Sequence, residues 1–429
     1  MSPAELLQDL IRFDTTNPPG NERACIEHIG SLLTRAGIEW RTYGASPERP
    51  NLVARLAGGG GPPLILQGHV DVVTTINQRW TRPPFSADLV DGWIWGRGAL
   101  DMKNGVAMMV TAFLRASREA VKLPGDLVLV VLADEEAGGV EGAAWLTDNH
   151  PELFTGAAYT IGEGGGYSYS MGGRRFYPIM ISEKRGCQLA VTFRGPGGHG
   201  SLPMRKGAMG KLGEALGALD RCRLPVHLTP VVEMQLKGVR DAVGGSLAED
   251  FDALLDPART DSVLDRMGAV GRNLDATLHN TVNATMVAGG LKINVIPSEV
   301  MLSLDGRLLP GQGPEDLIGE VREVIGDDAE IEVVKLAPAQ PEPDLSRFPV
   351  LAEVLTELDP EGVSIPYLVS GGTDGRHFAK LGIRTYGFTP VTLPDGFDGW
   401  ATIHDADERI PAAALDFGTE AIFRAVQRL

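Results

Sequence analysis

The chain has 429 residues, which is too long for one ordinary hydrophobic core and therefore predicts two domains. Its hydrophobic content of 43% and charged content of 22% are typical of soluble globular proteins. The formal net charge of −17 argues against nucleic acid and anionic membrane as partners, although a local cationic site can still bind a small substrate.

The cysteines and the N-terminal segment indicate the cellular location. Cys25, Cys187 and Cys222 are odd in number and lack CxxC spacing, which is typical of reduced thiols rather than of a disulfide framework or a thiolate zinc site. Residues 1–22 predict an amphipathic helix and a Pro-Gly turn, without the basic and apolar regions of a signal peptide. No apolar run approaches the roughly 20 residues that span a bilayer. We therefore expect a cytoplasmic protein.

The first part of the chain alternates predicted strands and helices. Leu64–Leu66 and Leu127–Leu132 are short apolar runs, as expected for strands buried in a largely parallel sheet, and Val106–Arg115 has the apolar spacing of a helix. Ligands of open α/β sheets bind beyond the carboxyl ends of the strands. His69 and the pair Glu135–Glu136 each follow a predicted strand directly, so we expect them on one rim of the sheet.

The pattern changes from about Cys187. The following segments are predicted in the order strand, helix, strand, strand, helix, strand: 187–194, 207–219, 280–287, 299–305, 314–325 and 330–334. This β-α-β-β-α-β order is ferredoxin-like. Residues from about Pro225 to His279 do not fit it, and we expect them to form an inserted, partly helical excursion.

The last part returns to α/β character. The proline-rich stretch APAQPEPD indicates a linker, and a helix is predicted at Val350–Leu358. The simplest account is a catalytic α/β domain made of residues 1–185 and 339–429. It is interrupted by a smaller inserted domain, residues 186–338.

Five residues have the chemistry of metal ligands, and each lies in a polar, glycine-containing break beside an apolar run: His69, Asp101, Glu136, Glu163 and His404. Nitrogen and carboxylate ligands without a thiolate suit zinc, and also manganese or cobalt. Several carboxylates in one set can hold two metals, with one carboxylate bridging them. Each residue also has a structural alternative, such as a strand-end histidine, a helix N-cap aspartate or exposed loop acids.

Two neighbouring acids have predicted supporting roles. A metal-bound histidine normally donates its other ring N–H to a carboxylate, and Asp71 lies two residues after His69. Glu135 and Glu136 are adjacent at a strand end and point to opposite sides, so one can bind metal while the other acts as a base.

The ordered motifs GHVDVV, GRGALDMKNG, DEEAGG, GEGGG and GPGGHGS, followed by a late histidine, closely resemble the M20 family of metallopeptidases and amidohydrolases. The resemblance spans nearly the whole chain and includes the interrupted two-domain layout. It implies a mixed-sheet, zinc-peptidase-like catalytic domain and a ferredoxin-like α+β lid or dimerisation domain. One departure is Asn104, where many members have glycine; we expect it to alter the loop without removing a ligand.

The resemblance also implies roles for the candidate residues. His69 and Glu163 would bind one metal, Glu136 and His404 would bind the other, and Asp101 would bridge the two. Asp71 would support His69, and Glu135 would be the general base and acid. The cofactors implied are two divalent ions, with Zn²⁺ expected and Co²⁺ or Mn²⁺ as alternatives.

Further positions match those that the family uses on its substrate. His199 in GPGGHGS would stabilise the oxyanion, delivered from the partner subunit of a homodimer. Asn294 and Arg307 would hold the substrate, although Arg307 can instead form a surface ion pair.

The motif GGTDGRHF supplies a second substrate-binding segment. Gly372 would allow close backbone approach, and Thr373 and Arg376 would grip a carboxylate. We interpret the neighbouring His377 as structural.

The function expected from these residues is hydrolysis of an amide bond next to a free carboxylate, in an N-acyl amino acid or a small peptide. A carboxypeptidase or dipeptidase is the alternative within the family, and the glutamate at position 163 leans towards the deacylases. A non-catalytic two-domain binding protein is a third reading, but such proteins usually lose the base or a ligand, and here all are present. The 225–279 excursion could build the acyl pocket or extend a dimer interface.

Overall fold

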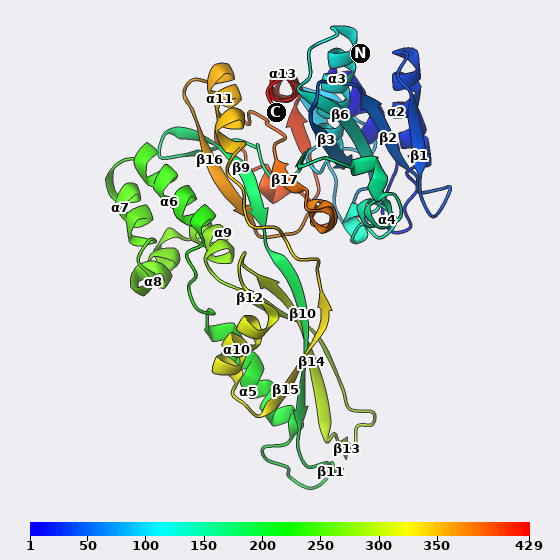
Figure 1. The fold of residues 1–429 in the computed structure, drawn as a ribbon. Helices are drawn as coiled ribbons and strands as arrows, with labels where there is room; N and C mark the ends of the chain where they lie inside the picture. The colour runs from blue at the N-terminus through cyan, green and yellow to red at the C-terminus, as the bar shows by residue number, and fades with distance from the viewer.

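The computed structural model describes all 429 residues and consists of a large α/β body and a smaller sheet that projects from it (Figure 1). The large body is built on a nine-stranded mixed sheet. Its strands lie in the order β1 (Trp40–Tyr43), β2 (Asn51–Leu56), β6 (Gly125–Leu132), β3 (Gly61–His69), β7 (Tyr159–Gly162), β17 (Arg384–Gly387), β9 (Arg174–Glu183) and β16 (Gly362–Val369), and β8 (Tyr169–Met171) pairs with β9. A small separate sheet contains β4 (Leu89–Val90), β5 (Trp93–Trp95) and β18 (Arg409–Pro411).

The centre of the large sheet is parallel, which confirms the two apolar runs as buried strands. β3 runs parallel to β6 on one side and to β7 on the other, and β7 runs parallel to β17. Their residues are buried almost continuously, because helices cover both faces of the sheet. The carboxyl ends of β3, β6 and β7 therefore share one rim.

Helices pack on both faces of the large sheet. One face is covered by α1 (Pro3–Ile11), α2 (Arg23–Arg35), α3 (Lys103–Arg118) and α13 (Ala412–Ala425), with α11 (Phe348–Leu358) beside β16. The opposite face has a smaller core under α4 (Ala143–Asn149) and α12 (Gly375–Phe378). No helix in the structure is both long and apolar enough to cross a bilayer.

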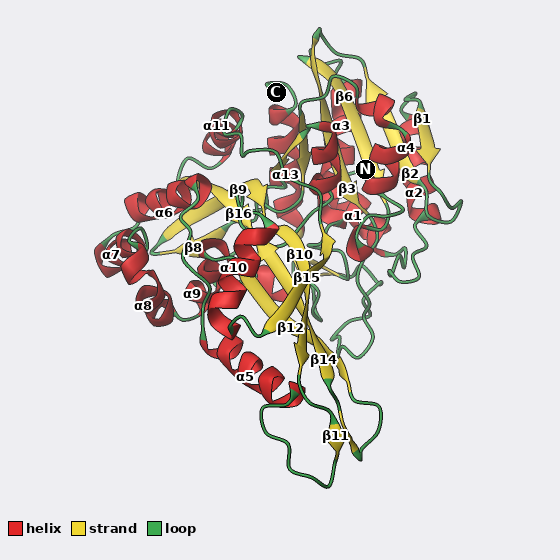
Figure 2. Cartoon of the chain, turned by 60° about the horizontal axis from the view of Figure 1, so that its bottom comes forward, coloured by secondary structure: helices red, strands yellow, loops and turns green.

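The projecting sheet has the expected ferredoxin-like topology. Its elements are β10 (Arg185–Arg194), α5 (Ala208–Arg221), β12 (Thr281–Gly289), β14 (Glu299–Leu308), α10 (Pro314–Ile325) and β15 (Ala329–Leu336). The strands are antiparallel in the order β12-β14-β10-β15, and α5 and α10 cover one face of the sheet (Figure 2). Seventeen buried residues form its own hydrophobic core, separate from the 67-residue core of the large body. A two-stranded extension, β11 (Gly198–His199) with β13 (Val295–Ile296), lies at its far end (Figure 1).

The excursion within the inserted segment is helical and packs on the large body. It consists of α6 (Pro230–Ala242), α7 (Gly245–Ala253), α8 (Pro257–Met267) and α9 (Ala269–Leu278). Val232 and Leu236 of α6 belong to the 67-residue core, and α6 lies against β16. The buried ammonium of Lys184 donates to the carbonyls of Ala276 and His279, which ties the end of α9 to the start of the inserted sheet. These helices therefore lie within the inserted segment in the sequence but pack on the large body in the structure.

The glycine run after Glu163 generates the first prediction. A Cβ at Gly165 would lie 2.6 Å from the Gly387 carbonyl oxygen and 2.7 Å from the Met180 nitrogen, both backbone atoms. We expect Gly165→Ala to lower the free energy of unfolding by about 1–3 kcal/mol, because backbone on two strands would have to shift. Urea denaturation measures this change.

Gly213→Ala in α5 is the matched control, because a Cβ there meets no atom within 4 Å. It should leave stability unchanged or raise it by about 0.5–1 kcal/mol, as alanine favours helix. Equal effects of the two substitutions would contradict the packing interpretation.

Candidate metal centre

The five predicted ligand residues lie together at the rim of the large sheet. His69 is the last residue of β3, Glu136 lies in the short 3₁₀ helix η1 (Glu135–Ala137) after β6, and Glu163 follows β7. Asp101 is in the loop before α3, and His404 is in the loop before β18. The parallel pairing of β3 with β6 and β7 thus aligns three of the ligands, while two long-range loops supply the others.

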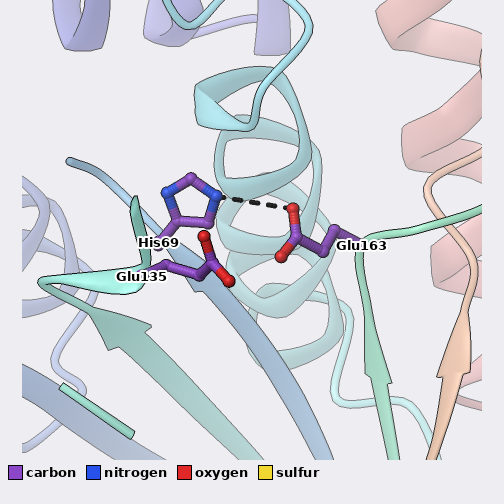
Figure 3. Close-up of side chains that lie close together, drawn as sticks. All are labelled: His69, Glu135 and Glu163. Carbon is purple, nitrogen blue, oxygen red and sulfur yellow. Dashed lines mark ion pairs between the residues drawn. The ribbon is translucent and has the colours of Figure 1, made fainter. Parts of the chain in front are cut away.

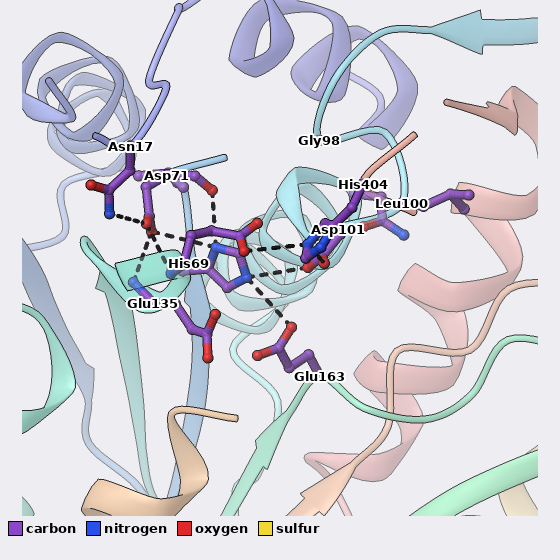
Figure 4. Close-up of polar contacts among 12 residues, drawn as sticks. Asn17, His69, Asp71, Gly98, Leu100, Asp101, Glu135, Glu163 and His404 are labelled. Atoms are coloured by element: carbon purple, nitrogen blue, oxygen red, sulfur yellow. Dashed lines mark hydrogen bonds and ion pairs between the residues drawn. The ribbon is translucent and has the colours of Figure 1, made fainter. Parts of the chain in front are cut away.

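Asp101 lies between the two histidines (Figure 4). Its Oδ1 is 3.3 Å from His69 Nε2, and its Oδ2 is 3.0 Å from His404 Nε2. Each histidine also faces one glutamate: His69 Nε2 is 3.4 Å from Glu163 Oε2, and His404 Nε2 is 3.3 Å from Glu136 Oε2. The arrangement has two halves, one histidine and one glutamate in each, joined by a single carboxylate.

Glu135 adds a further carboxylate beside one half. Its side chain points towards the space between His69 and Glu163 (Figure 3), and ligand atoms of these three residues lie within 4.8 Å of one another. Ligand atoms of His69, Asp101 and Glu136 are equally close. Geometry alone therefore permits Glu135 to be a ligand or a base next to the ligands.

The residues present fit a pair of divalent metal ions. His69 Nε2 and Glu136 Oε1 are buried and have no hydrogen-bond partner, although unpaired polar atoms are rare in protein interiors. Imidazole nitrogen and carboxylate oxygen are donors for zinc, cobalt and manganese. One cation in each half would satisfy these two atoms and offset the gathered negative charge.

The site is strongly coupled electrostatically. Burial, together with the charge of Glu163, raises the pKa of Glu135 well above its usual value. Burial would lower the pKa of His69, but the charge of Glu163 and the nearby carboxylates of Asp101 and Asp71 raise it well above the ordinary value. Hydrogen bonds to Asp101 and Glu136 raise the pKa of His404 to about 10. The raised pKa values of both histidines reflect the carboxylate charge gathered around them.

Asp71 supports more than His69. His69 Nδ1 is 3.0 Å from the Asp71 main-chain carbonyl and 3.5 Å from its carboxylate. The carboxylate accepts hydrogen bonds from the backbone N–H groups of Glu135 and Glu136, at 3.1 Å each, and from Asn17 Nδ2 at 2.8 Å (Figure 4). One buried acid therefore orients His69, a candidate ligand, and the whole turn that carries both glutamates.

The GGTDGRHF segment reaches the same site. Arg376 Nη2 is 3.5 Å from Glu135 Oε1, which brings a cation beside the predicted base. The hydroxyl and the N–H of Thr373 both donate to Glu183 Oε2, so Thr373 holds this loop, and its contact with a substrate stays a prediction. Gly372 lies next to the Arg376 guanidinium. His377 is buried and contacts the Gly138 carbonyl, as expected of a structural residue.

Three predicted residues of the inserted domain do not join this cluster within one chain. His199 and Asn294 are neighbours at its far end, where the Gly200 N–H donates to the Asn294 carbonyl (Figure 1). Arg307 in β14 pairs with Asp305 through Nε and Nη2, which is the surface ion pair considered as its alternative. No hydrogen bond or ion pair links any of the three to the ligand residues.

Several supporting residues were not predicted from the sequence. Asn17, Glu183 and Glu408 are buried and hydrogen-bond to segments that carry site residues. Glu408 had a local signal, because it lies four residues after His404 in the same polar motif. Glu183 and Asn17 had none, since their partners lie 190 and 54 residues away.

Comparison with known proteins identifies relatives. A family model described as peptidase family M20/M25/M40 matches residues 65–428. The Bos taurus protein N-fatty-acyl-amino acid synthase/hydrolase PM20D1 is 27% identical over 390 residues, covering 85% of this chain and 74% of its own length. The Dictyostelium discoideum protein "Probable carboxypeptidase S-like 2" is 27% identical over 375 residues, covering 81% of this chain and 68% of its own.

The fold is shared with solved structures. An M20 family metallo-carboxypeptidase, Sso-CP2 from Sulfolobus solfataricus, superposes with a TM-score of 0.69 at 17% identity. The match covers 100% of this chain and 99% of the other. It confirms the expected architecture of a mixed-sheet α/β body with an inserted domain.

Glu183 generates a prediction about pH. Burial raises its pKa from 4.5 to about 7, against the hydrogen bonds from Thr373. The folded protein thus holds this proton more tightly than the unfolded chain, so stability is lost as pH rises from about 4.5 to about 7. We expect Glu183→Gln to remove this loss. The difference in free energy of unfolding between variant and wild type should therefore shift by up to about 3 kcal/mol in favour of the variant from pH 4 to pH 8.

Denaturant unfolding of both proteins at pH 4 and pH 8 measures the difference, in which titrating groups that do not interact with Glu183 cancel. An identical pH dependence of wild type and variant would show that Glu183 ionises normally in the folded protein.

Proposed function

Because the chain belongs to peptidase family M20/M25/M40, it is a hydrolase of amide bonds, and we propose that its substrate is an N-acyl amino acid or a short peptide cleaved next to the free carboxylate. The observation that carries this proposal is the position of Asp101, whose two oxygens face two different histidine–glutamate pairs. Such a set suits two cations that share one carboxylate. Family membership and the complete ligand set argue against a non-catalytic binding protein.

We assign His69 and Glu163 to one metal, Glu136 and His404 to the other, and Asp101 to both. The nitrogen and oxygen donors favour Zn²⁺, with Co²⁺ or Mn²⁺ as alternatives. Bound metals would polarise the scissile carbonyl and acidify water to a pKa of about 7.

Glu135 is the proposed general base and acid. Each half of the ligand set already has a histidine, a glutamate and an oxygen of Asp101, so Glu135 is free to move protons. Its raised pKa favours a carboxyl group that can take a proton from water and give it to the leaving nitrogen. Its position 3.5 Å from Arg376 keeps the ionised form accessible.

Arg376 is the proposed binding group for the substrate carboxylate. It is largely buried at the edge of the ligand cluster, and guanidinium binds carboxylate with two parallel hydrogen bonds. Gly372 leaves room beside it, and Thr373 keeps the loop in place. A cation at this point would select substrates that carry a free carboxylate next to the scissile amide.

Two observations bear on the choice between N-acyl amino acids and peptides as substrates. Relatives that cover most of this chain include an N-fatty-acyl-amino acid synthase/hydrolase as well as a carboxypeptidase-like protein. A glutamate at position 163 leans towards the deacylases. A carboxypeptidase or dipeptidase activity is the second candidate.

A hydrolysis screen with added Zn²⁺, Co²⁺ or Mn²⁺ tests the proposal. N-acetyl, N-succinyl and long-chain N-acyl amino acids are compared with dipeptides, and each N-acyl amino acid with its C-terminal amide. We expect turnover of N-acyl amino acids and loss of it when the free carboxylate is blocked. Equal turnover of acid and amide would contradict the role of Arg376.

Glu135→Gln assigns the activity to this site. We expect kcat to fall by about 10²–10⁴ while two metals stay bound, because the base is lost and every ligand remains. Glu152→Gln, at an exposed position, is the control and should be as active as wild type. Full activity of the Glu135 variant would exclude it as the base.

We further propose a homodimer through the inserted domain, in the cytoplasm. The location rests on the three unpaired cysteines. The dimer is supported by β12, an edge strand whose residues from Asn283 to Gly289 are exposed on both faces. An edge strand that is long and apolar is a site for pairing with another chain. In such a dimer, His199 and Asn294 would reach the site of the partner.

Val287→Lys on β12 tests the dimer. Val287 is 55% exposed, and we expect a charge there to convert a dimer to monomers in sedimentation velocity and to lower kcat. Val334→Lys on β15, the opposite edge strand, is 67% exposed and should leave the dimer intact. A wild type that is monomeric and fully active would contradict both the dimer and the role of His199 across it.

A further inference from the structure

A buried polar network lies behind the two loops that carry Asp101 and His404. Its centre is Glu408, whose side chain is fully buried. One carboxylate oxygen accepts hydrogen bonds from the N–H groups of Leu100, at 2.6 Å, and Asp101, at 3.1 Å. The other accepts Arg97 Nη1 at 2.7 Å and the Gly98 N–H at 3.2 Å. All four donors belong to the loop before α3, so Glu408 determines the path of the backbone that presents Asp101.

The same loop is held from its other side. The Tyr167 hydroxyl donates to the Leu100 carbonyl, and Asn104 Nδ2 donates to the Tyr167 hydroxyl at 2.9 Å. Asn104, the departure from the glycine common in the family, therefore belongs to the support of this loop. The peptide before Asp101 is bonded at both its carbonyl and its N–H ends.

Gln78 connects this network to the His404 loop. Its Nε2 donates to the His404 carbonyl at 2.7 Å, and its Oε1 accepts Arg97 Nη2 at 2.7 Å and Trp80 Nε1 at 3.1 Å. The Arg97 guanidinium also lies over the Trp80 ring, 5.1 Å from its centroid. Arg97 thus bonds Glu408 with one nitrogen and Gln78 with the other, and it joins the two loops.

His404 depends on this anchor more than the other ligands do. Its side chain is 50% exposed, whereas that of His69 is 1% exposed. Its backbone has a φ of 64°, in the left-handed region that a non-glycine residue rarely adopts without support. Packing alone does not hold a half-exposed residue in this conformation. The hydrogen bond from Gln78 to the His404 carbonyl holds its backbone, and the hydrogen bonds from Thr81 to Asp407 hold the same loop three residues further on.

We infer that Gln78, Arg97 and Glu408 are positioning residues that set the separation of Asp101 from His404, and with it the affinity for the metal held by Glu136 and His404. The inference rests on the proposed function, because it uses the ligand assignment given there. Residues that orient ligands without touching the metal commonly change its affinity by about 10- to 100-fold when they are replaced.

The two ends of the network predict different losses. Gln78 contacts the His404 loop, so Gln78→Met should lower the affinity for only one of the two zinc ions, by about tenfold or more. Glu408 holds the backbone of Asp101, which faces both histidines, so Glu408→Gln should weaken both. The amide of the variant puts a donor against two existing donors in either orientation.

The experiment is a Zn²⁺ titration of the full-length, chelator-treated protein, measured by calorimetry. Metal analysis of the protein after free Zn²⁺ has been removed gives the number of bound ions. Glu320→Gln is the control: it alters another buried carboxylate, bonded to Asn280 and His227 in the inserted domain. We expect it to lower stability without changing either zinc affinity. Activity of Gln78→Met should return at high Zn²⁺ concentration, which a general folding defect would not allow.

The inference would be overturned if Gln78→Met bound both zinc ions with wild-type affinity, or if it lost affinity for both ions equally. If Glu408→Gln does not fold, Gln78→Met still decides. A wild type that binds two zinc ions but hydrolyses none of the substrates would overturn the proposed function and leave the network to be judged by the titration alone. A wild type that binds none of Zn²⁺, Co²⁺ and Mn²⁺ would overturn both.

Discussion

Several carboxylates are held close together and largely buried at one point of the sheet rim, and the surrounding structure must compensate for their charge. Asp101, Glu136 and Glu163 lie around His69 and His404, and Glu135 lies beside them. Like charges held this close repel, and burial raises their cost further. The cluster is tolerable only with cations or protons among the carboxylates, and two divalent ions are the cations that fit this donor set. The folded protein therefore carries a site that is incomplete without its metals.

Two further buried carboxylates hold the cluster in shape from behind. Asp71 accepts the N–H groups of Glu135 and Glu136, and Glu408 accepts those of Leu100 and Asp101. In both places an acid bonds the backbone of a ligand-bearing turn, so the turn cannot relax away from its repelling neighbours. Preorganisation of this kind keeps ligand atoms in place before a metal binds.

The inserted domain stands apart from this centre in a single chain. Its four-stranded sheet has its own core, and the tip with His199 and Asn294 lies at the far end from the metal ligands (Figure 1). The helices α6–α9 leave that sheet and pack on the large body instead. The helices α6–α9, which follow α5, thus enlarge the large body. The ferredoxin-like sheet keeps its topology although these helices lie between α5 and β12 in the chain.

Local sequence patterns were enough to predict the strands, the inserted sheet and the polar segments of the candidate site. Apolar runs predicted β3 and β6, the alternation after Cys187 predicted the ferredoxin-like sheet, and the polar breaks at strand ends predicted residues that the fold brings together at one rim. These succeed because strand burial and the parallel pairing of neighbouring strands are encoded within short segments.

The distant groups that support the candidate ligands became visible only in the folded arrangement. Asp101 and Glu408 are 307 residues apart, and no periodicity relates them. The same holds for Thr373 with Glu183, for Arg376 beside Glu135, and for the packing of α6 on β16. Hydrogen bonds between remote segments form only once the whole sheet has brought its loops together, so local sequence carries no signal of them.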